Sequence, residues 1–211
     1  MKAFLLALFA LGLMLFSPAV HATDTANVKD PAIVFVDSLA NTFIHKIFVK
    51  DKKESAKVDD FRSVFKSNCD IPFISKFVLG KAYKTASADE KKAFQDTFTE
   101  NVVLTWAGRF KEYAGQTIAV KGTRPAQTGQ IYVDSKVISP NPNTKPINLV
   151  WRLKNNDGDY KIADLIVEGV SMVMTYRSEY AAILQNNGNS VSALTDSLKA
   201  KNKVLAKSLG I

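Results

Sequence analysis

The spacing of apolar residues changes twice along the chain, and these changes constrain the fold more than any other feature. Apolar side chains recur every three or four residues up to Tyr113, alternate with polar ones from Gln116 to Glu168, and form helical segments again from Met172 onward. The outer patterns predict helices and the middle one predicts strands. The alternating segments are joined by connections too short for a crossover helix, which favours an antiparallel sheet. These segments are 116–122, 130–139, 147–154 and 160–168.

This order of elements predicts an α+β fold, in which a curved, antiparallel four-stranded sheet packs against several long helices. The helix expected to be central begins at a capping box formed by Ser87 and Glu90 and runs to Tyr113. Its apolar stripe is too wide for a surface helix. The chain contains 13 phenylalanines, which suit either a well-filled core or a lined apolar pocket. Further helix limits are predicted at Asp30, Asp70, Gly80, Gln185, Val191 and Leu209.

The first 22 residues have the composition of a cleavable secretory signal peptide. Lys2 is followed by an apolar run, and Val20 and Ala22 occupy the −3 and −1 positions of a signal-peptidase site. The residue directly after Ala22 is not a cysteine, so a lipoprotein anchor is not expected. No later segment has the length of a transmembrane helix. We therefore predict a soluble, exported protein in which residues 1–22 are removed and residues 23–211 form one domain.

Few residues are suited to catalysis. Cys69 is the only cysteine and His45 is the only histidine after the signal peptide, which excludes a two-histidine metal site. Ser171 stands in GVSMV, which lacks the second glycine of a nucleophile elbow. Asp164 and Glu168 would lie roughly 13 Å apart on one strand, too far for a glycosidase pair. We expect no enzyme, catalytic residue, metal or cofactor; an isomerase that uses Asp164 in an apolar pocket is the alternative.

The chain carries a formal net charge of +8, and its lysines are concentrated at 50–53, 76–92 and 199–207. A basic surface can indicate nucleic-acid binding, but an exported protein without an Arg-rich motif is a poor candidate for it. Anionic lipid head groups or an acidic partner surface fit the compartment better, and solvated helix faces explain the lysines equally well. An adaptor that only docks through its basic face is therefore a further alternative.

Three segments resemble the MlaC family, the toluene-tolerance or auxiliary phospholipid-binding proteins of a periplasmic ABC lipid-transport system. They are VLGKAYKTASADEKKAFQDTFTENV, YAGQTIAV and IADLIVEGVSMVMTYRSEYAAILQNNG, and the resemblance extends from about Pro31 to Leu198. Its most specific part is the pattern D-x-x-V-E-G-V-S-x-x-x-x-Y-R. Tyr83 and Lys84, where the family usually has Trp-Arg, are a conservative departure. The residues that match the pattern are Asp164, Val167, Glu168, Gly169, Val170, Ser171, Tyr176 and Arg177.

The resemblance implies a soluble periplasmic carrier with a single lipid-binding domain at residues 23–211. Family members hold the acyl chains of a phospholipid, as cargo rather than cofactor, in an apolar pocket enclosed by helices and sheet. They shuttle it between an outer-membrane lipoprotein complex and an inner-membrane ABC complex, which maintains lipid asymmetry. The implied partners are phospholipid, these two complexes and, transiently, the membranes; we expect a monomer that binds no nucleic acid. Relatives linked to hopanoids leave another amphiphile open as cargo.

The resemblance and the apolar pattern together suggest which residues line the pocket. Gly169 and Ser171 predict a corner where the last strand ends and a helix begins. Arg177 is expected to pair with Glu168 rather than with a lipid phosphate. For each lining candidate, an ordinary core position is an equally good interpretation. The candidates are Phe94, Phe98, Val102, Leu149, Trp151, Leu165, Val167, Val170, Met172 and Tyr176.

Overall fold

The sheet has five strands rather than the four expected from the sequence. The computed structural model describes residues 30–127 and 129–211, so the predicted signal peptide lies outside the described residues. Neighbouring strands are antiparallel and follow the chain order β1-β2-β3-β4-β5, as the short connections predicted. The strands are β1 (Thr117–Pro125), β2 (Gln130–Ile138), β3 (Ile147–Asn156), β4 (Asp159–Val167) and β5 (Val170–Ser171).

The fifth strand exists because the chain reverses direction at Glu168 and Gly169. Both residues have positive φ, 47° and 83°, as the favoured two-residue hairpin turns require. The turn folds β5 back onto the end of β4 before the next helix begins. The glycine therefore marks a corner, as predicted, but the corner also closes a hairpin. A strand of two residues is too short to show the alternation by which the other strands were recognised.

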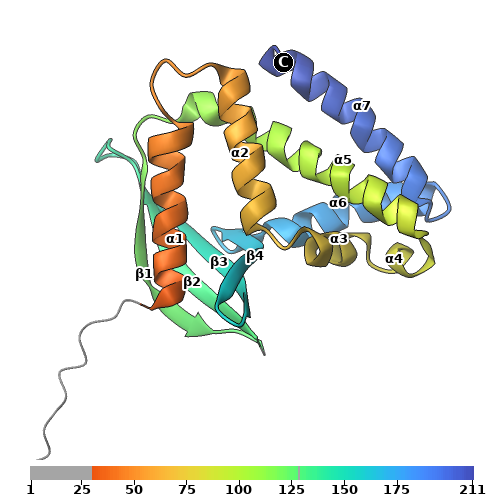
Figure 1. Cartoon of the computed structure of the whole chain (residues 1–211), viewed down its shortest axis with the longest axis horizontal. Helices are drawn as coiled ribbons and strands as arrows, with labels where there is room; N and C mark the ends of the chain where they lie inside the picture. The colour runs from red at the N-terminus through yellow and green to blue at the C-terminus, as the bar shows by residue number, and fades with distance from the viewer. Residues whose placement is uncertain (1–29, 128) are drawn as a thin grey trace, which may run out of the picture.

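The helices form two groups beside and in front of the sheet. One helix, α1, lies across a face of the sheet, and the remaining helices form a separate layer next to the β4 edge (Figure 1). The helices are α1 (Pro31–Thr42), α2 (Glu54–Asn68), α3 (Ile71–Leu79), α4 (Ala82–Thr85), α5 (Ala88–Ala107), α6 (Met172–Asn186) and α7 (Val191–Leu209), with a π-helical turn η1 (Phe43–Ile47) and a 3₁₀ turn η2 (Phe110–Glu112).

The helix starts predicted at Asp30, Asp70 and Ser87 are confirmed, because each of these residues caps a helix. Asp30 accepts from the Ala32 N–H at 2.9 Å, and its second carboxylate oxygen accepts from Thr123 Oγ1 at 2.8 Å, which ties the start of α1 to β1. Asp70 caps α3, and Ser87 forms the predicted capping box with the residue three positions on. These caps satisfy N–H groups that have no partner inside their helices.

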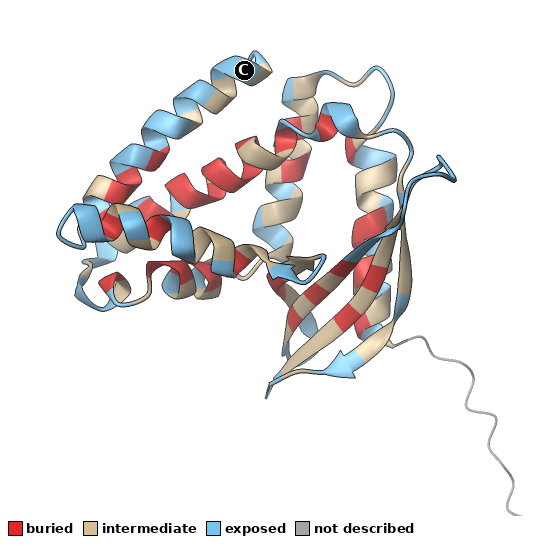
Figure 2. Ribbon diagram, turned by 180° about the vertical axis from the view of Figure 1, so that it is seen from behind, coloured by how far each residue is buried: buried red, intermediate tan, exposed pale blue. Residues whose placement is uncertain are grey.

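Helix α5 is central, as predicted, but it is shorter than expected. It ends at Ala107 instead of Tyr113, because Gly108 follows it and the chain then turns through η2. Glycine disfavours a helix interior by about 1 kcal/mol relative to alanine. The apolar residues beyond this point continue the spacing of three, so the pattern alone did not reveal the break. Figure 2 shows buried residues along much of α5 and alternating along the strands.

Three hydrophobic clusters hold the elements together. The helical cluster joins α3, α5, α6 and α7 around Phe94, Phe98, Tyr180 and Leu194. The sheet cluster joins α1 to β2, β3 and β4 around Val36, Val133, Trp151 and Leu153. The end cluster joins η1, α2, the last turns of α5, η2 and the last turns of α7 around Ile47, Val58, Phe61, Val103, Leu104 and Phe110.

Candidate functional site

A small apolar cavity lies where the three clusters meet. It is lined by the edge of β4 and by residues of α2, α3, α5 and α6, and its volume is about 50 Å³. Phe65 and Trp106 belong to both the helical and the end cluster, and Leu165 belongs to the sheet cluster. The wall is apolar except for one carboxylate. The lining residues are Phe65, Cys69, Ile74, Phe98, Val102, Trp106, Ile162, Asp164, Leu165, Met172, Val173 and Tyr176.

Half of the candidates chosen from the sequence lie in this wall: Phe98, Val102, Leu165, Met172 and Tyr176. The other candidates lie elsewhere in the molecule. Phe94 stacks on Phe98 at 5.7 Å within the helical cluster, one turn away from the cavity. Leu149, Trp151 and Val167 pack in the sheet cluster under α1. Val170 is 55% exposed on the short strand β5 and does not point between sheet and helices as expected.

The remaining lining residues were not among the candidates. Phe65 lies on α2, and Cys69 directly follows that helix. Cys69 reaches the cavity because the segment between α2 and α3 runs beside β4, where Cys69 forms a parallel bridge with Ile162. The Asp70 N–H donates to the Ile162 carbonyl at 2.9 Å in the same place. This pairing joins residues far apart in sequence, and no local pattern predicts it.

Asp164 is the charged residue in the wall, and it ties β4 to the start of α6. Its carboxylate accepts from Ser171 Oγ at 2.5 Å and from the Val173 N–H at 3.1 Å, and Arg152 Nη2 lies 3.6 Å away. Ser171 Oγ in turn accepts from the Met174 N–H, which confirms Ser171 as the cap of α6. Both oxygens of Asp164 are thus engaged within the chain. This arrangement does not favour Asp164 as a general base.

The predicted pair between Arg177 and Glu168 does not form. Arg177 Nη1 donates to the Phe77 carbonyl at 3.1 Å, and its guanidinium lies over the Phe77 ring. Glu168 accepts from Asn148 on β3 instead. Glu168 lies in the turn that reverses the chain and contacts β3. Arg177 lies in the second turn of α6 and faces α3. Arg177 therefore fastens α6 to α3 within the helical layer.

Burial keeps the thiol and the phenol of the wall neutral. It raises the pKa of the Cys69 thiol to about 12, with a smaller contribution from the neighbouring Asp70 carboxylate. Burial also raises the pKa of Tyr176, although the nearby Trp106 indole opposes the shift. A thiol with this pKa is a poor nucleophile at neutral pH. The cavity therefore offers an uncharged surface along most of its wall.

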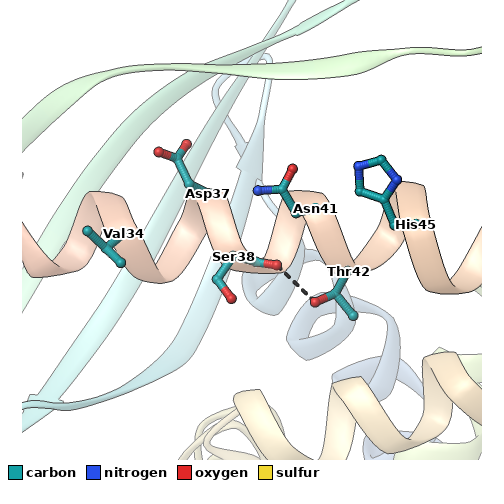
Figure 3. Close-up of a pocket in the computed structure, with 6 residues that line it drawn as sticks. All are labelled: Val34, Asp37, Ser38, Asn41, Thr42 and His45. Carbon is teal, nitrogen blue, oxygen red and sulfur yellow. Dashed lines mark hydrogen bonds between the residues drawn. The ribbon is translucent and has the colours of Figure 1, made fainter.

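A second, larger depression runs along the exposed side of α1 (Figure 3). Its volume is about 580 Å³, but a single helical stretch forms its wall, so it is open to water. Most of its side chains are polar, and Thr42 Oγ1 donates to the Ser38 carbonyl at 2.9 Å. Such a surface cannot shield an acyl chain, so the smaller cavity is the better candidate for the apolar pocket expected from the sequence. The residues of the depression are Val34, Asp37, Ser38, Asn41, Thr42 and His45.

Two further properties concern membranes and metals. No helix in the described part of the chain is both long and apolar enough to cross a bilayer. Within residues 30–127 and 129–211, no three histidine, cysteine or acidic side chains are grouped so that they could hold a metal ion.

Comparison with known proteins reveals relatives along most of the chain. The family model described as MlaC protein matches residues 37–200. The intermembrane phospholipid transport system binding protein MlaC of Haemophilus influenzae is 25% identical over 174 residues, which cover 79% of this chain and 80% of that protein. The toluene tolerance protein ttg2D of Pseudomonas putida is 26% identical over 124 residues, 58% of this chain and 57% of that protein.

The fold also matches that of a solved structure. The phospholipid-binding protein from Ralstonia solanacearum, determined in complex with a phospholipid, superimposes with a TM-score of 0.68. The match covers 83% of this chain and 97% of that chain, at 22% sequence identity. At this level of identity, the likeness shows a shared arrangement of helices and antiparallel sheet.

Proposed function

The chain belongs to the MlaC family, whose model matches residues 37–200 of its 211 residues, and on this premise we propose that the protein is a periplasmic phospholipid carrier. It takes acyl chains into the cavity beside β4 and shuttles them between an inner-membrane ABC complex and an outer-membrane lipoprotein complex. The observation that carries the proposal is an apolar cavity at the meeting point of three hydrophobic clusters. The name of the Haemophilus influenzae relative and the phospholipid held by the Ralstonia solanacearum protein support the choice of cargo.

A carrier is needed because a phospholipid cannot cross water unaided at a useful rate. Exposing roughly 30 methylene groups at about 0.8 kcal/mol each would cost on the order of 25 kcal/mol. A protein that transfers the lipid must offer surroundings about as apolar as a bilayer, so that uptake and release are both close to balance. The largely apolar wall of the cavity beside β4 meets this requirement.

The cavity must widen before it can hold acyl chains. A volume of about 50 Å³ has room for one or two water molecules, at roughly 30 Å³ each. Ligand pockets usually measure about 300–1,000 Å³. We therefore expect the helical layer to move away from β4 when lipid enters. The contacts that cross this boundary include the hydrogen bonds of Asp164 to α6 and the ion pair between Lys154 and Asp70.

The contacts that such a movement would break contribute little free energy individually. A hydrogen bond contributes only about 0.5–1.5 kcal/mol net to stability, or about 1.5–3 kcal/mol when one partner is charged. The acyl chains leave a bilayer that is about as apolar as the cavity wall, so their transfer is close to balance, and the contacts between lipid and wall have to offset the cost of opening. The lipid itself would then fill the space between the helices and the sheet, replacing contacts that separation removes.

Two neighbouring valines provide a test of the site. Val102 lines the cavity, whereas Val103 is fully buried in the end cluster. Val102→Phe fills the space and should strongly reduce the phospholipid that co-purifies from periplasm. Val103→Phe is the matched control: overpacking costs it about 1–3 kcal/mol of stability, but its lipid content should stay at the wild-type level. Native mass spectrometry and lipid extraction measure both.

The outcomes separate the site from the function. If the wild-type protein carries no amphiphile under any purification condition, the carrier proposal fails. If Val103→Phe loses lipid as completely as Val102→Phe, the cavity beside β4 is not the binding site. Recovery of a hopanoid or another amphiphile in place of phospholipid would preserve the carrier and change its cargo.

A further inference from the structure

Three segments that are far apart in the sequence meet at one end of the molecule. The end cluster packs η1 and the start of α2 against η2 and the last turns of α7. Figure 1 shows the η1–α2 connection, η2 and the C-terminal end of α7 along the same edge, away from α4. Leu205 and Leu209 of α7 pack inward on this cluster, so the outward side chains of these turns are presented to solvent (Figure 2).

Positive charge is in surplus at this end. Within the described residues, six exposed lysines of these segments take part in no ion pair, against a single unpaired side-chain carboxylate, that of Asp51. The surplus among side chains is therefore six minus one, or five charges. The neighbouring acids Glu54, Asp59, Asp60 and Glu112 are each paired with a lysine or an arginine. The six lysines are Lys50, Lys53, Lys111, Lys201, Lys203 and Lys207.

Exposed aliphatic side chains lie among these lysines. Val204 is 69% exposed, the highest value among the large hydrophobic residues that are exposed, and it follows Lys203 directly on α7. Ile211 is 43% exposed just beyond the helix, and Val49 is 42% exposed beside Lys50 on the η1–α2 connection. Two of the three segments, the η1–α2 connection and the end of α7, thus combine solvent-exposed aliphatic groups with neighbouring lysines. This combination is typical of elements that lie on a lipid surface.

We propose that this end of the molecule docks on an anionic lipid bilayer. The six lysines meet the head-group phosphates, while Val49, Val204 and Ile211 enter the boundary between head groups and acyl chains. An acidic protein surface would match the charges equally well, but aliphatic side chains dispersed singly among lysines suit the boundary of head groups and acyl chains better than the continuous apolar core of a protein interface. Attraction between surface charges is screened by salt, so the docked state is reversible, as a shuttling protein requires.

The inference rests on the proposed carrier function and adds the surface that meets the membrane. Phe65 and Trp106 form part of the cavity wall and also pack against the end cluster. The docking surface and the cavity are therefore connected through one layer of side chains. A protein bound by this end would hold its lipid site a short distance from the bilayer.

Vesicle co-sedimentation tests the proposal with the purified protein. Phosphatidylcholine vesicles containing phosphatidylglycerol should bind the protein, pure phosphatidylcholine vesicles should not, and sodium chloride should weaken binding. The double variant Lys203→Glu and Lys207→Glu should lower the partition coefficient by roughly tenfold or more. The matched control, Lys81→Glu at the N-cap of α4 together with Lys84→Glu within that helix, makes the same change in charge away from the end cluster and should bind as the wild type does. Val204→Ser should weaken binding without changing charge.

Two results would overturn the proposal. The first is a wild-type protein that does not bind the phosphatidylglycerol vesicles, which would point to an acidic protein partner. The second is an equal loss of vesicle binding in both double variants, which would show that net charge, and not this surface, determines binding. Native mass spectrometry of the same samples keeps the proposals apart. Retained phospholipid without vesicle binding contradicts only the docking surface, and vesicle binding without any bound amphiphile contradicts only the carrier function.

Discussion

Trp151 and Trp106 stand on opposite sides of the boundary between the sheet and the helical layer, and only Trp151 sits in a filled core. Trp151 is 4% exposed, and its indole N–H donates at 3.0 Å to Ser135 Oγ, which donates at 2.7 Å to the Leu149 carbonyl. Trp106 is partly exposed and forms part of the cavity wall. The surroundings of Trp151 are set by long strands in fixed register. The surroundings of Trp106 are formed by side chains from several separate elements. The contrast suggests that the molecule opens at this boundary, the junction between β4 and the helical layer, and not within the sheet.

Truncating one leucine inside the sheet cluster and one that borders the cavity should give the largest effect and an unequal one. Leu153 is fully buried in the sheet cluster, so Leu153→Ala should lower the free energy of unfolding by about 2–5 kcal/mol. Leu165 is partly exposed and already borders a cavity, so Leu165→Ala should cost about 1–2 kcal/mol. Chemical denaturation of the lipid-free protein measures both. Equal losses would show that the junction is as tightly packed as the sheet.

The charge that fastens the junction is the next feature to test. Asp164 is 4% exposed and holds α6 to β4, and its replacement by asparagine leaves Arg152 without its carboxylate. We expect Asp164→Asn to cost about 2–3 kcal/mol. Asp134→Asn on β2 is the control, because its pair with Arg124 is exposed to solvent and such pairs contribute at most about 1 kcal/mol. A loss no greater than the control's would mean that Asp164 does not fasten the junction.

Most of the fold could be predicted from the sequence because its signals are local. Alternation identified β1 to β4, and the capping residues Asp30, Asp70 and Ser87 identified where three helices begin. The errors arose where a short-range signal was weak or ambiguous. The two-residue strand β5 has no alternation to recognise, and Gly108 interrupts a spacing that continues beyond it. In both places the backbone conformation, rather than the apolar pattern, decides the structure.

The site could be predicted only in part, for a different reason. Apolar residues on α5 and β4 look the same in sequence whether they face a void or a filled core. Trp151 and Leu165 occupy paired positions on adjacent strands, yet only Leu165 borders the cavity. The difference depends on what the helical layer places opposite each residue, such as Phe65 and Cys69. Those placements follow from long-range contacts that an individual sequence does not show.

The titration of the Cys69 thiol shows whether water reaches the junction. In the unfolded chain the Cys69 thiol has its ordinary pKa of 9.0, and in the folded protein burial raises its pKa to about 12. Above pH 9 the folded state therefore binds more protons than the unfolded state, so stability falls as pH rises, by at most about 1.4 kcal/mol per pH unit. At pH 10.5 the wild type should have lost about 2 kcal/mol more than Cys69→Ser, which cannot titrate there.

Denaturation series of the two proteins between pH 8 and pH 10.5 supply this measurement. The difference between them isolates the thiol, because lysines and tyrosines titrate in both. If the two pH profiles coincide, the thiol is solvated in the folded state, and the junction is open to water even without lipid. That outcome would remove the contrast with the tightly packed surroundings of Trp151.

The smallest expected effect compares two helix caps of identical type. Ser171 and Ser190 each accept an N–H from the residue three positions on, at 3.1 Å, and so cap α6 and α7. Replacing either with alanine should cost about 1 kcal/mol for the lost cap. Ser171 also donates to Asp164, so Ser171→Ala should cost roughly 1 kcal/mol more than Ser190→Ala. Thermal or chemical denaturation resolves such a difference. Because the extra bond crosses the junction, Ser171→Ala should also speed lipid exchange with vesicles, while Ser190→Ala should not. Identical exchange rates in the two variants would show that the bond to Asp164 has no part in opening the cavity.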